Sequence, residues 1–464
     1  MKRRDFIRST ALLAAATGTG GMMQHADAAT AKPQAEGKDE IEADKAQATP
    51  LIVSAPMLQN YAETTIGITF AVSALANGYV IYGKEPDLSD GKKTWCGGYR
   101  VTDISDKAVQ IRLTGLEPAT TYYYRIGADR ISYKGGYQMK IVGNEEDYHI
   151  YSFTTAGRKA RAHFCVINDT HVAWLPFSRC IETIVRLEPS CVIWNGDAGN
   201  CEETEDNLIR IFLRPDIERR DYASTIPYIF CPGNHDCRGM ANRHLERIWM
   251  YRQPEERRPQ DWDLGRNFAV RMGEIAMIGL DTAEDKPDAH PAFAGLFNSE
   301  AYRRAQTGWL EDALDRPEIS DAPYLVAFCH IPLYDDNPRN NPGDCLPGEE
   351  NGRYDQGFAM WQKTCADMWA PLLQKAHCQL VITAHQHRYR FFPATEERTW
   401  AQIIGGGPDT GYTGEGENWK VTPGRFATVI EGLVEKGRLR VNIYNTSTAR
   451  LQESHTFPPR RGRK

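Results

Sequence analysis

Hydrophobic and polar residues follow two different patterns along the chain, and the pattern changes near residue 157. Before that position, short runs of alternating apolar and polar residues are separated by turn residues, which is typical of half-buried strands. These runs cover residues 66–72, 78–82, 108–113 and 120–126. The pattern predicts a small all-β sandwich over residues 51–157, and we expect it to act as a scaffold.

After residue 157, apolar strand-like runs alternate with polar loops and amphipathic helix-like stretches. The helical periodicity is clear in residues 177–187 and 300–314, where Trp309 and Leu310 fall on one stripe. The strand-like runs are residues 162–167, 191–194, 226–230, 275–280, 323–329, 379–383, 400–404, 426–433 and 439–444. This alternation predicts an α/β domain over residues 158–457, an α+β sandwich of mixed β-sheets flanked by helices.

The N-terminal region follows neither pattern. Arg3 and Arg4 precede a mildly apolar run over residues 11–23, and small residues come after it. This arrangement resembles a twin-arginine export signal over residues 1–28, so we expect a bacterial protein exported to the periplasm or secreted. The alternative is a cytosolic protein with a basic start. The apolar run is too short to span a membrane, and residues 29–50 are predicted to be a flexible linker.

Composition is that of a soluble globular protein. The length of 464 residues suggests two domains, and 41% hydrophobic with 25% charged residues suffice for a full core. The net charge of -6 argues against a general nucleic-acid partner, and residues 458–464 are predicted to be a basic tail. The 11 cysteines are an odd number without paired spacing, so we expect buried thiols and few or no disulfides.

Five of the strand-like runs end in side chains that can bind metal ions. These are Asp169 and His171, Asp197, Asn234 with His235 and Asp236, His330, and finally His385 and His387. Taken singly, each has a plain structural explanation, such as a turn cap for Asp169 or a core histidine for His330. Together they point to a site, because open α/β sheets bind ligands at the C-terminal ends of their strands. We therefore expect these side chains to converge on one rim of one sheet.

The segment of residues 231–236 shows the chemistry that this set offers. Asn234 presents a neutral carbonyl oxygen to a hard or borderline metal ion. His235 has a side chain that titrates near neutral pH, and Asp236 is expected to hold the His235 ring in one tautomer.

These motifs resemble those of the calcineurin-like metallophosphoesterase superfamily, over about residues 160–450. With the β-sandwich in front, the chain resembles the two-domain arrangement of purple acid phosphatases. The resemblance implies a centre of two divalent metal ions, for which Fe, Zn and Mn are all suitable. It implies that Asp169, His171 and His387 bind one ion, that Asn234, His330 and His385 bind the other, and that Asp197 bridges them. His235 would face the leaving group as a catalytic residue supported by Asp236.

The sandwich carries a resemblance of its own. Residues 116–124 resemble the strand-entry motif of fibronectin type III domains, in which Tyr122 would be the corner tyrosine whose hydroxyl bonds back to the chain. Residues 151–155 resemble the last strand of that family. Any other small β-sandwich would have the same consequence, a scaffold rather than a catalyst.

The chain departs from the purple acid phosphatases at two positions. That subgroup has a tyrosine three residues after the bridging aspartate, whose phenolate binds ferric iron and gives the colour, and here the position is Asn200. It has a glycine two residues after its first aspartate, where this chain has His171. An imidazole thus replaces the phenolate and the number of ligands is kept, which predicts a colourless site of divalent ions.

The implied centre suits the hydrolysis of phosphoric esters. Two divalent ions lower the pKa of a shared water and stabilise the charge that builds on the phosphate. We expect in-line attack of the bridging hydroxide on a phosphomonoester, with His235 protonating the leaving group. A phosphodiesterase or nucleotidase on the same centre is the alternative, and a non-catalytic surface binding protein is an alternative of another class. The expected partner is a small phosphate ester, with no nucleic acid and no membrane span.

Three further features lie near the motifs. Arg238 and Arg243 would suit a phosphate, but a solvated helix face would suit them equally. Residues 335–356 are rich in Pro, Asn, Gly and charge, and their length predicts a lid or substrate-selecting loop. The three glycines at residues 405–407 are predicted to form a close-packed turn beside the site, because no Lys-Ser or Lys-Thr pair follows as in a nucleotide loop.

Overall fold

The structure is a computed structural model of the chain and describes residues 49–97, 104–251, 262–286, 288–289, 293–336, 356–408 and 426–460. The predicted export signal, nearly all of the linker and most of the predicted lid lie outside these residues. Among the described helices, none combines the length and the hydropathy that crossing a membrane would need.

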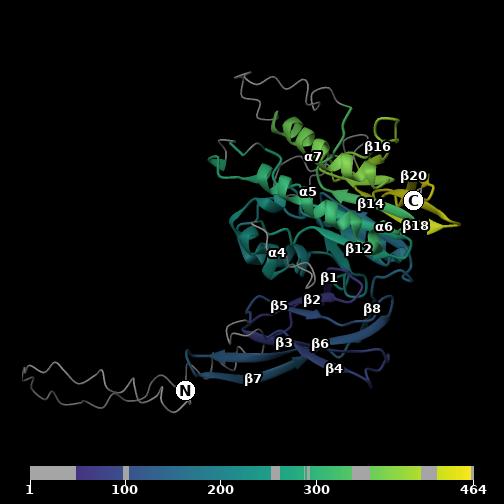
Figure 1. Ribbon diagram of the computed structural model, residues 1–464. Coiled ribbons are helices and arrows are strands. Elements are labelled where there is room, and N and C mark those ends of the chain that lie inside the picture. The colour runs from purple at the N-terminus through teal and green to yellow at the C-terminus, as the bar shows by residue number, and fades with distance from the viewer. Residues whose placement is uncertain are drawn as a thin grey trace, which may run out of the picture. The chain divides into compact units, whose positions relative to one another are not determined.

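The described strands form three sheets, which Figure 1 shows with the helices. The nine-stranded sheet has the order β20 (Arg450–Phe457), β19 (Arg438–Asn445), β18 (Thr428–Glu435), β9 (His163–Ile167), β10 (Cys191–Trp194), β11 (Tyr228–Phe230), β1 (Met57–Gln59), β2 (Ile66–Ala71) and β5 (Ala108–Leu113). The six-stranded sheet has the order β12 (Phe268–Met272), β13 (Ile275–Leu280), β14 (Tyr324–Cys329), β15 (Leu380–Thr383), β17 (Ala401–Ile404) and β16 (Arg390–Phe392). The five-stranded sheet contains β4 (Lys92–Trp95), β3 (Ala76–Gly83), β6 (Thr121–Tyr133) and β7 (Met139–Glu146), with β8 (Tyr151–Thr154) paired to β6. The helices are α3 (Trp174–Leu187), α4 (Glu205–Phe212), α5 (Ser299–Asp315), α6 (Pro317–Ser320) and α7 (Gln356–Lys375), and the 3-10 helices are η1 (His235–Cys237) and η2 (Met240–Arg247).

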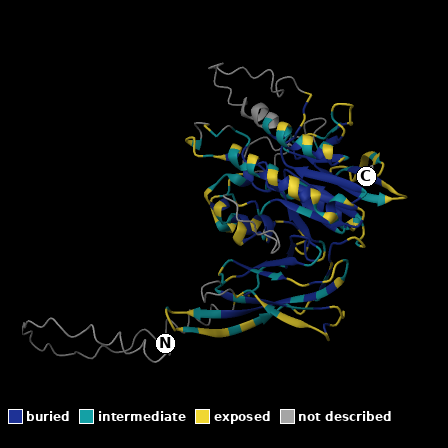
Figure 2. Cartoon of the chain, in the orientation of Figure 1, coloured by how far each residue is buried: buried dark blue, intermediate teal, exposed yellow. Residues whose placement is uncertain are grey.

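The nine-stranded and six-stranded sheets share one apolar core. Their central strands, such as β10 and β14, are continuous apolar runs buried on both faces (Figure 2). Phe164 of β9 and Phe328 of β14 meet edge to face in this core, with ring centroids 5.6 Å apart. Side chains of α3 and α4 pack on the other face of the nine-stranded sheet, and those of α5 and α7 on the other face of the six-stranded sheet. Mixed sheets flanked by helices confirm the predicted fold class.

Parallel pairing brings the ends of the motif strands together within each sheet. β10 pairs in parallel with β9 and β11, and β14 pairs in parallel with β13 and β15. The strand ends therefore lie on two sheets, and the expectation of a single sheet is wrong. The reason is that β13, β14 and β15 pack on the first sheet through their side chains and do not extend it by hydrogen bonds.

Helix α4 begins with a reciprocal pair of hydrogen bonds. The backbone N–H of Asn207 donates to Oγ1 of Thr204 at 3.3 Å, and the backbone N–H of Thr204 donates to Oδ1 of Asn207 at 3.2 Å. Glu205 and Asp206 follow in the first turn, where the positive end of the helix dipole favours carboxylates. The cap fixes the end of the loop that leaves β10 and contains Asp197.

The strands before residue 157 build a second apolar core, in which Phe70 and Ile111 of the nine-stranded sheet pack with Val80 and Ile126 of the five-stranded sheet. The backbone N–H of Glu117 donates to the hydroxyl of Tyr122 at 2.9 Å, the bond expected of a corner tyrosine. The fibronectin type III assignment itself stays a prediction.

Sheet pairing crosses the predicted domain boundary. β1 pairs in parallel with β11, with Gln59 opposite Tyr228, so that β1, β2 and β5 extend the nine-stranded sheet. The hydroxyl of Tyr124 in β6 donates to the carbonyl oxygen of Ser224 at 2.7 Å. Residues 50–464 accordingly form one compact unit, and a boundary near residue 157 stays a prediction.

The described cysteines are free thiols. Cys165, Cys191, Cys231 and Cys329 are buried in or beside strands, which confirms their role as small core residues.

Candidate metal centre

Loops from both central sheets bring the candidate ligands to one place. Their ligand atoms form two groups, Asp169, His171, Asp197 and His387 in one and Asp197, His330 and His385 in the other, with all atoms of a group within 4.8 Å of one another. Asp197 belongs to both groups, as a bridging residue would. Oδ1 of Asn234 lies 2.9 Å from Nδ1 of His385, so the structure brings all seven predicted ligands together. Their roles as ligands stay predictions.

Asn195 fastens the two sheets at this edge. Its Nδ2 donates to the carbonyl oxygen of Cys329 at 3.1 Å and to that of Ile382 at 3.2 Å, which are the ends of β14 and β15. The backbone carbonyl oxygen of Asn195 lies 2.8 Å from Nδ1 of His330. One asparagine after β10 thus holds the ligand loops of the six-stranded sheet against those of the nine-stranded sheet.

Two motif glycines are needed for the close approach of these loops. A Cβ atom on Gly196 would lie 2.3 Å from Nδ1 of His330, and Gly196 has a φ of 83°. A Cβ atom on Gly233 would lie 2.3 Å from Oδ1 of Asp197. Only glycine fits at both positions, which explains why one precedes Asp197 and the other precedes Asn234.

The backbone at five ligand positions is left-handed. The φ angles are 47° at Asp169, 44° at His171, 52° at Asp197, 70° at His385 and 52° at His387. Non-glycine residues rarely adopt this conformation, which costs about 1 kcal/mol or more for each. These left-handed turns direct the five side chains toward the cluster, and they lower the stability of the loops that contain them.

His330 faces Asp197 in a geometry that calls for a cation. Nδ1 of His330 donates to the carbonyl of Asn195, so Nε2 presents a lone pair, and it lies 3.1 Å from Oδ2 of Asp197. Two lone pairs at that distance repel unless a positive charge lies between them. Burial opposes charge on His330, but Asp197 and Asp169 outweigh it and raise the pKa of His330 to about 10. In the metal-free site a proton supplies this charge, and a metal ion would displace it.

His171 and His387 meet on the other side of Asp197. Their Nε2 atoms are 2.9 Å apart, and Nδ1 of His171 lies 3.1 Å from the carbonyl oxygen of Gly199 and 3.0 Å from Oδ1 of Asn200. Burial lowers the pKa of His171. Bonded through Nδ1 and facing His387 through Nε2, the ring has the orientation of a metal ligand.

Asp169 is buried and ionised. Burial would raise its pKa, but His387 and His330 outweigh burial and lower the pKa of Asp169 to about 2. Asp169 Oδ1 and Oδ2 also accept the backbone N–H of His385 at 3.2 and 3.1 Å. The carboxylate therefore ties the loop after β9 to the loop after β15.

His235 lies beside the cluster and has partners on both ring nitrogens. Nδ1 lies 2.9 Å from the carbonyl oxygen of Asn200, and Nη1 of Arg238 lies 3.1 Å from Nε2. Because a carbonyl only accepts and a guanidinium only donates, Nδ1 carries the hydrogen and Nε2 the lone pair. Burial lowers the pKa of His235 to about 4, so the ring is neutral at pH 7.

The expectation that Asp236 holds the His235 ring is wrong. Oδ2 of Asp236 accepts the backbone N–H of Gly233 and of Asp197, both at 2.8 Å, and Oδ1 accepts that of Ala198 at 3.3 Å. The backbone N–H groups of two tight loops thus occupy both oxygens of this buried carboxylate. Burial and the nearby Asp197 raise the pKa of Asp236 to about 7.

The sequence analysis missed two acidic residues at this site. Glu284 and Asp285 follow β13, a strand whose C-terminal end was not considered, and both bond to Arg238. Oδ2 of Asp285 lies 3.9 Å from Nε2 of His385. The signal was available, because an acidic pair follows the apolar run 275–280 closely. Arg238 is partly buried and held by these contacts, so a solvated helix face does not describe it.

The glycines at 405–407 pack against the first motif as predicted. A Cβ atom on Gly405 would lie 2.0 Å from Oδ1 of Asn168, and one on Gly407 would lie 2.7 Å from Cβ of Asp169.

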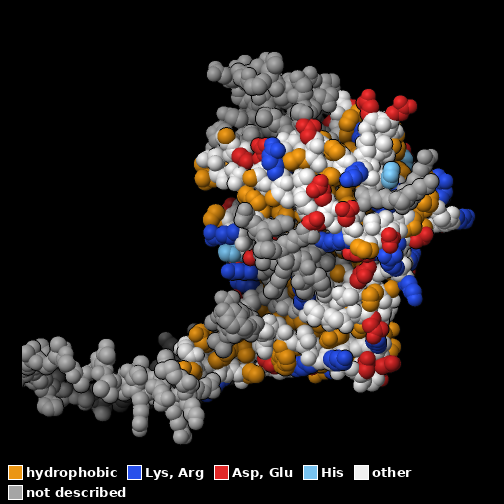
Figure 3. Space-filling model, viewed as in Figure 1, with side chains coloured by type: hydrophobic (Ala, Val, Ile, Leu, Met, Phe, Trp, Pro, Cys, Tyr) orange, Lys and Arg blue, Asp and Glu red, His pale blue; other side chains and the backbone are white. Residues whose placement is uncertain are grey.

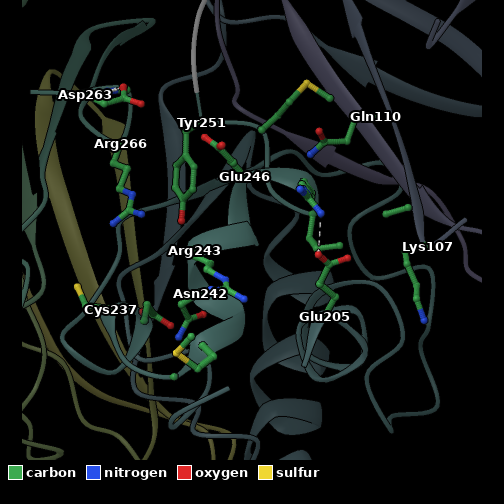
Figure 4. Close-up of a pocket in the computed structure, with 18 of the residues that line it drawn as sticks. Lys107, Gln110, Glu205, Cys237, Asn242, Arg243, Glu246, Tyr251, Asp263 and Arg266 are labelled. Atoms are coloured by element: carbon green, nitrogen blue, oxygen red, sulfur yellow. Dashed lines mark hydrogen bonds and ion pairs between the residues drawn. The ribbon is translucent and has the colours of Figure 1, made fainter. Parts of the chain in front are cut away.

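A cavity of about 1270 Å³ borders the other side of the His235 loop, where Asp236 and Cys237 meet residues of β5 and η2 (Figure 4). None of the seven predicted ligands lines it. Arg243 and Arg266 line it together with Glu205 and Glu246, so its walls carry charges of both signs. Arg243 itself is exposed and bonds to His244 at 3.1 Å.

The cluster fits two divalent cations. Imidazole nitrogen, carboxylate oxygen and amide oxygen are the donors that Zn, Fe and Mn accept. Nε2 of His330 faces Oδ2 of Asp197, and Nε2 of His171 faces Nε2 of His387. In each pair, a positive charge between the two atoms would relieve the repulsion of their lone pairs.

Comparison with known proteins agrees with this chemistry. A model of the calcineurin-like phosphoesterase family matches residues 162–389. Probable purple acid phosphatase 20 of Arabidopsis thaliana is 24% identical over 301 residues, which are 63% of this chain and 56% of that protein. Purple acid phosphatase 21 of the same plant is 23% identical over 321 residues, which are 68% of this chain and 60% of that protein. The chain therefore spans less than two thirds of the length of these relatives.

Two solved structures share the fold. Purple acid phosphatase PPD1 from yellow lupin (Lupinus luteus) seeds superposes with a TM-score of 0.56 at 14% identity, over 87% of this chain and 74% of that chain. PhoD superposes with a TM-score of 0.55 at 11% identity, over 88% of this chain and 94% of that chain. The family match contains every residue of the cluster, from Asp169 to His387. Residues 162–389 therefore carry a calcineurin-like metallophosphoesterase domain, the domain of a metal-dependent phosphoesterase.

Proposed function

We propose that this chain is an exported hydrolase that uses two divalent metal ions to cleave small phosphomonoesters. The supporting observation is the convergence of two carboxylates, four imidazoles and an amide oxygen from two sheets. One ion is assigned to Asp169, His171 and His387, the other to Asn234, His330 and His385, and Asp197 lies between them.

When bound, the two ions supply a water of lowered pKa and a positive field for the phosphate. The residues of the chain preserve that field. Only Asp169 and Asp197 among the proposed ligands are anionic, and the amide of Asn234 and the imidazoles add no negative charge. Burial of Asp169 and Asp197 keeps water away from the cluster and strengthens its electrostatic interactions.

His235 is assigned to the leaving-group side. In the substrate-free site its Nε2 accepts from Arg238 and carries no proton. A phosphate dianion beside the ring favours the imidazolium, because opposite charge raises a histidine pKa. Substrate binding and proton uptake are therefore coupled, and the charged ring can then protonate the departing alkoxide.

The test compares two aryl substrates. The purified protein should hydrolyse para-nitrophenyl phosphate faster than bis-para-nitrophenyl phosphate. Chelator should abolish turnover, and Zn or Mn should restore it. Metal-replete protein that hydrolyses neither ester would contradict the proposal and favour a non-catalytic binding protein.

A phosphodiesterase or nucleotidase is the second candidate, and one observation favours it. Arg238 is bound to Glu284 and Asp285 and does not face the cluster as an open guanidinium. A monoester dianion gains more from extra positive charge than a diester monoanion does. Faster cleavage of the diester in the comparison above would select this candidate.

Export is assigned to residues 1–28 through the paired Arg3 and Arg4. Replacing both arginines by lysine should leave the protein in the cytoplasm of a bacterial host, as measured by activity in periplasmic and cytoplasmic fractions. Periplasmic activity that survives this change would argue against the twin-arginine route.

A further inference from the structure

A partly buried cluster of charges lies next to His235. Nε and Nη2 of Arg238 bond to the two carboxylate oxygens of Glu284 at 2.8 and 2.6 Å, and Nη2 also bonds to Oδ1 of Asp285 at 2.6 Å. The side chain of Arg238 is 11% exposed and that of Glu284 is 0% exposed. The guanidinium lies 5.8 Å from the ring centroid of Phe293, which further restricts it. Arg238 is thus fixed in place before any substrate arrives.

The charges of this cluster balance among themselves. Nζ of Lys286 bonds to the carboxylate of Asp285 at 2.9 and 3.1 Å, so two cations accompany two carboxylates. A balanced cluster adds little to the field of the metal centre, and a phosphate would have to compete with two carboxylates for Arg238. The guanidinium is therefore poorly suited to be the main phosphate contact.

One donor of Arg238 points at the site. Nη1 lies 3.1 Å from Nε2 of His235, while the three contacts to Glu284 and Asp285 use Nε and Nη2. The other nitrogen of the ring, Nδ1, lies 2.9 Å from the carbonyl oxygen of Asn200. The ring is held between two fixed groups, an acceptor on one side and a donor on the other.

We propose that Arg238, fixed by Glu284 and Asp285, is a positioning residue that holds the neutral His235 ring as the Nδ1–H tautomer by donating to its Nε2 lone pair. The proton for the leaving group would enter at this Nε2 when substrate binds, and it would replace the hydrogen bond from Arg238. The role of His235 rests on the proposed hydrolase function, whereas the hydrogen bond does not. Asp285 extends the arrangement to the metal centre, because its Oδ2 lies 3.9 Å from Nε2 of His385.

The kinetic test uses Arg238→Gln, with Glu284→Gln as a milder variant that keeps the shape of the cluster. Loss of the hydrogen bond should lower kcat for an alkyl phosphomonoester about five- to tenfold, with less change for 2,4-dinitrophenyl phosphate, whose leaving group needs no proton. In a His235→Ala background the same substitution should have no further effect. Arg243→Gln removes an exposed guanidinium of the same region and should leave kcat unchanged.

Two kinetic outcomes would overturn the proposal. One is an equal loss on both substrates, which is the result of a purely structural role. The other is a full additional loss in the His235→Ala background, which would mean that Arg238 acts independently of the ring.

A measurement without turnover separates this proposal from the proposed function. In the zinc-loaded protein, the ring nitrogens of His235 should give the ¹⁵N signature of the Nδ1–H tautomer, and Arg238→Gln should mix the two tautomers. An Nε2–H ring in the unmodified protein, or a ring unchanged in Arg238→Gln, would overturn the positioning role even if the protein were an active phosphatase. The predicted signature in a protein that hydrolyses no phosphoric ester would support the positioning role while the proposed function failed.

Discussion

The two ring nitrogens of His171 have different surroundings, which orient the ring with Nε2 in the cluster. Nδ1 is bonded to Gly199 and faces Asn200, and Nε2 is 2.9 Å from the ring of His387. His171 and Asn200 stand where the purple enzymes have glycine and tyrosine, and in this chain the two side chains contact each other.

The metal-replete protein should be colourless, because no described side chain of the cluster is a phenolate. We expect no absorption band in the visible range from a native preparation of known metal content. The double variant His171→Gly with Asn200→Tyr, loaded with ferric iron, should acquire such a band. A visible band in the unmodified protein would contradict the divalent, phenolate-free site.

His235→Ala should separate catalysis from metal binding. The ring contacts Asn200 and Arg238 and belongs to neither group of clustered ligands. We expect kcat for an alkyl phosphomonoester to fall by about 10²- to 10⁴-fold. Both metal ions should stay bound, as measured by elemental analysis. Lost metal with retained turnover would reverse the assignment.

Residue types at strand ends could be predicted, but their local partners could not. Seven ligand candidates converge because the end of a buried strand is visible in the sequence. The predicted contact of Asp236 with the His235 ring was wrong, because residue types do not show which backbone N–H groups of a tight loop need an acceptor. Glu284 and Asp285 were missed because a short turn separates them from the end of β13.

Neighbouring strands of the nine-stranded sheet are joined by side chains as well as by backbone hydrogen bonds. In β9, Nε2 of His163 lies 2.8 Å from Oε1 of Glu431 in β18. Oε2 of Glu431 accepts from Nδ2 of Asn442 at 2.8 Å and from the hydroxyl of Tyr444 at 3.2 Å. His163, which lies outside the motifs, thus belongs to a buried network that joins β9 to its neighbours.

Glu431→Gln should lower the free energy of unfolding by about 2 kcal/mol at pH 7, because it removes hydrogen bonds to a buried charge. Burial would raise the pKa of Glu431, but the bonds from His163 and Asn442 outweigh it and lower the pKa. The stabilisation is therefore complete above the unfolded pKa of about 4.3 and is lost as the pH falls through the lower folded value. Denaturant unfolding at several pH values measures the difference.

The matched control is Glu435→Gln at the end of the same strand. Glu435 forms an exposed pair with Arg440, and such pairs contribute about 0–1 kcal/mol. Equal losses in the two variants, or a loss for Glu431→Gln that grows as the pH falls below 4, would contradict the buried network.

Gly407→Ala should weaken metal binding, because the new methyl group would lie 2.7 Å from Cβ of Asp169. The loop after β9 would have to move, and Asp169 with it. We expect a lower affinity for the ion assigned to Asp169, measured by calorimetric titration of the metal-free protein. Gly308→Ala is the control, because nothing lies within 4 Å of its added methyl group in α5, and it should stabilise the protein by about 1 kcal/mol.

Element type was predictable from the alternation in β5 and from the continuous apolar runs of β10 and β13, and the bounds of all three match the predicted runs. β11 starts two residues late, and Pro227 precedes it without an N–H to donate to a ladder. The division into two central sheets was not predictable. The hydrophobic pattern of a strand shows that it is buried, but it does not show which strand pairs with it.

At the scale of the whole molecule, backbone hydrogen bonds join β1, which precedes residue 157, to β11 and to the loop before it. Leu58 N–H donates to the carbonyl of Ala223 and Asn60 N–H to that of Tyr228, both at 2.9 Å. Charged side chains of both signs are interspersed on the face in Figure 3, in keeping with a modest net charge of -6. The sandwich is thus a continuation of the core rather than a tethered module.

Residues 50–464 should therefore unfold in a single cooperative transition. Tyr124→Phe removes the hydroxyl that bonds to Ser224 across the junction, and it should lower the midpoint of that one transition by the equivalent of about 1 kcal/mol. Scanning calorimetry of metal-replete protein measures both. Two separated transitions, with only one shifted by Tyr124→Phe, would mean that the sandwich folds independently.

The left-handed turns at Asp169, His171, Asp197, His385 and His387 have an evolutionary consequence. Glycine at any of these positions would relax the chain and take away a donor in the same step. A lineage with no further use for the cations would gain by losing these residues one after another. Each of these five residues therefore keeps a side chain that can bind a metal ion, at a backbone cost that glycine would avoid.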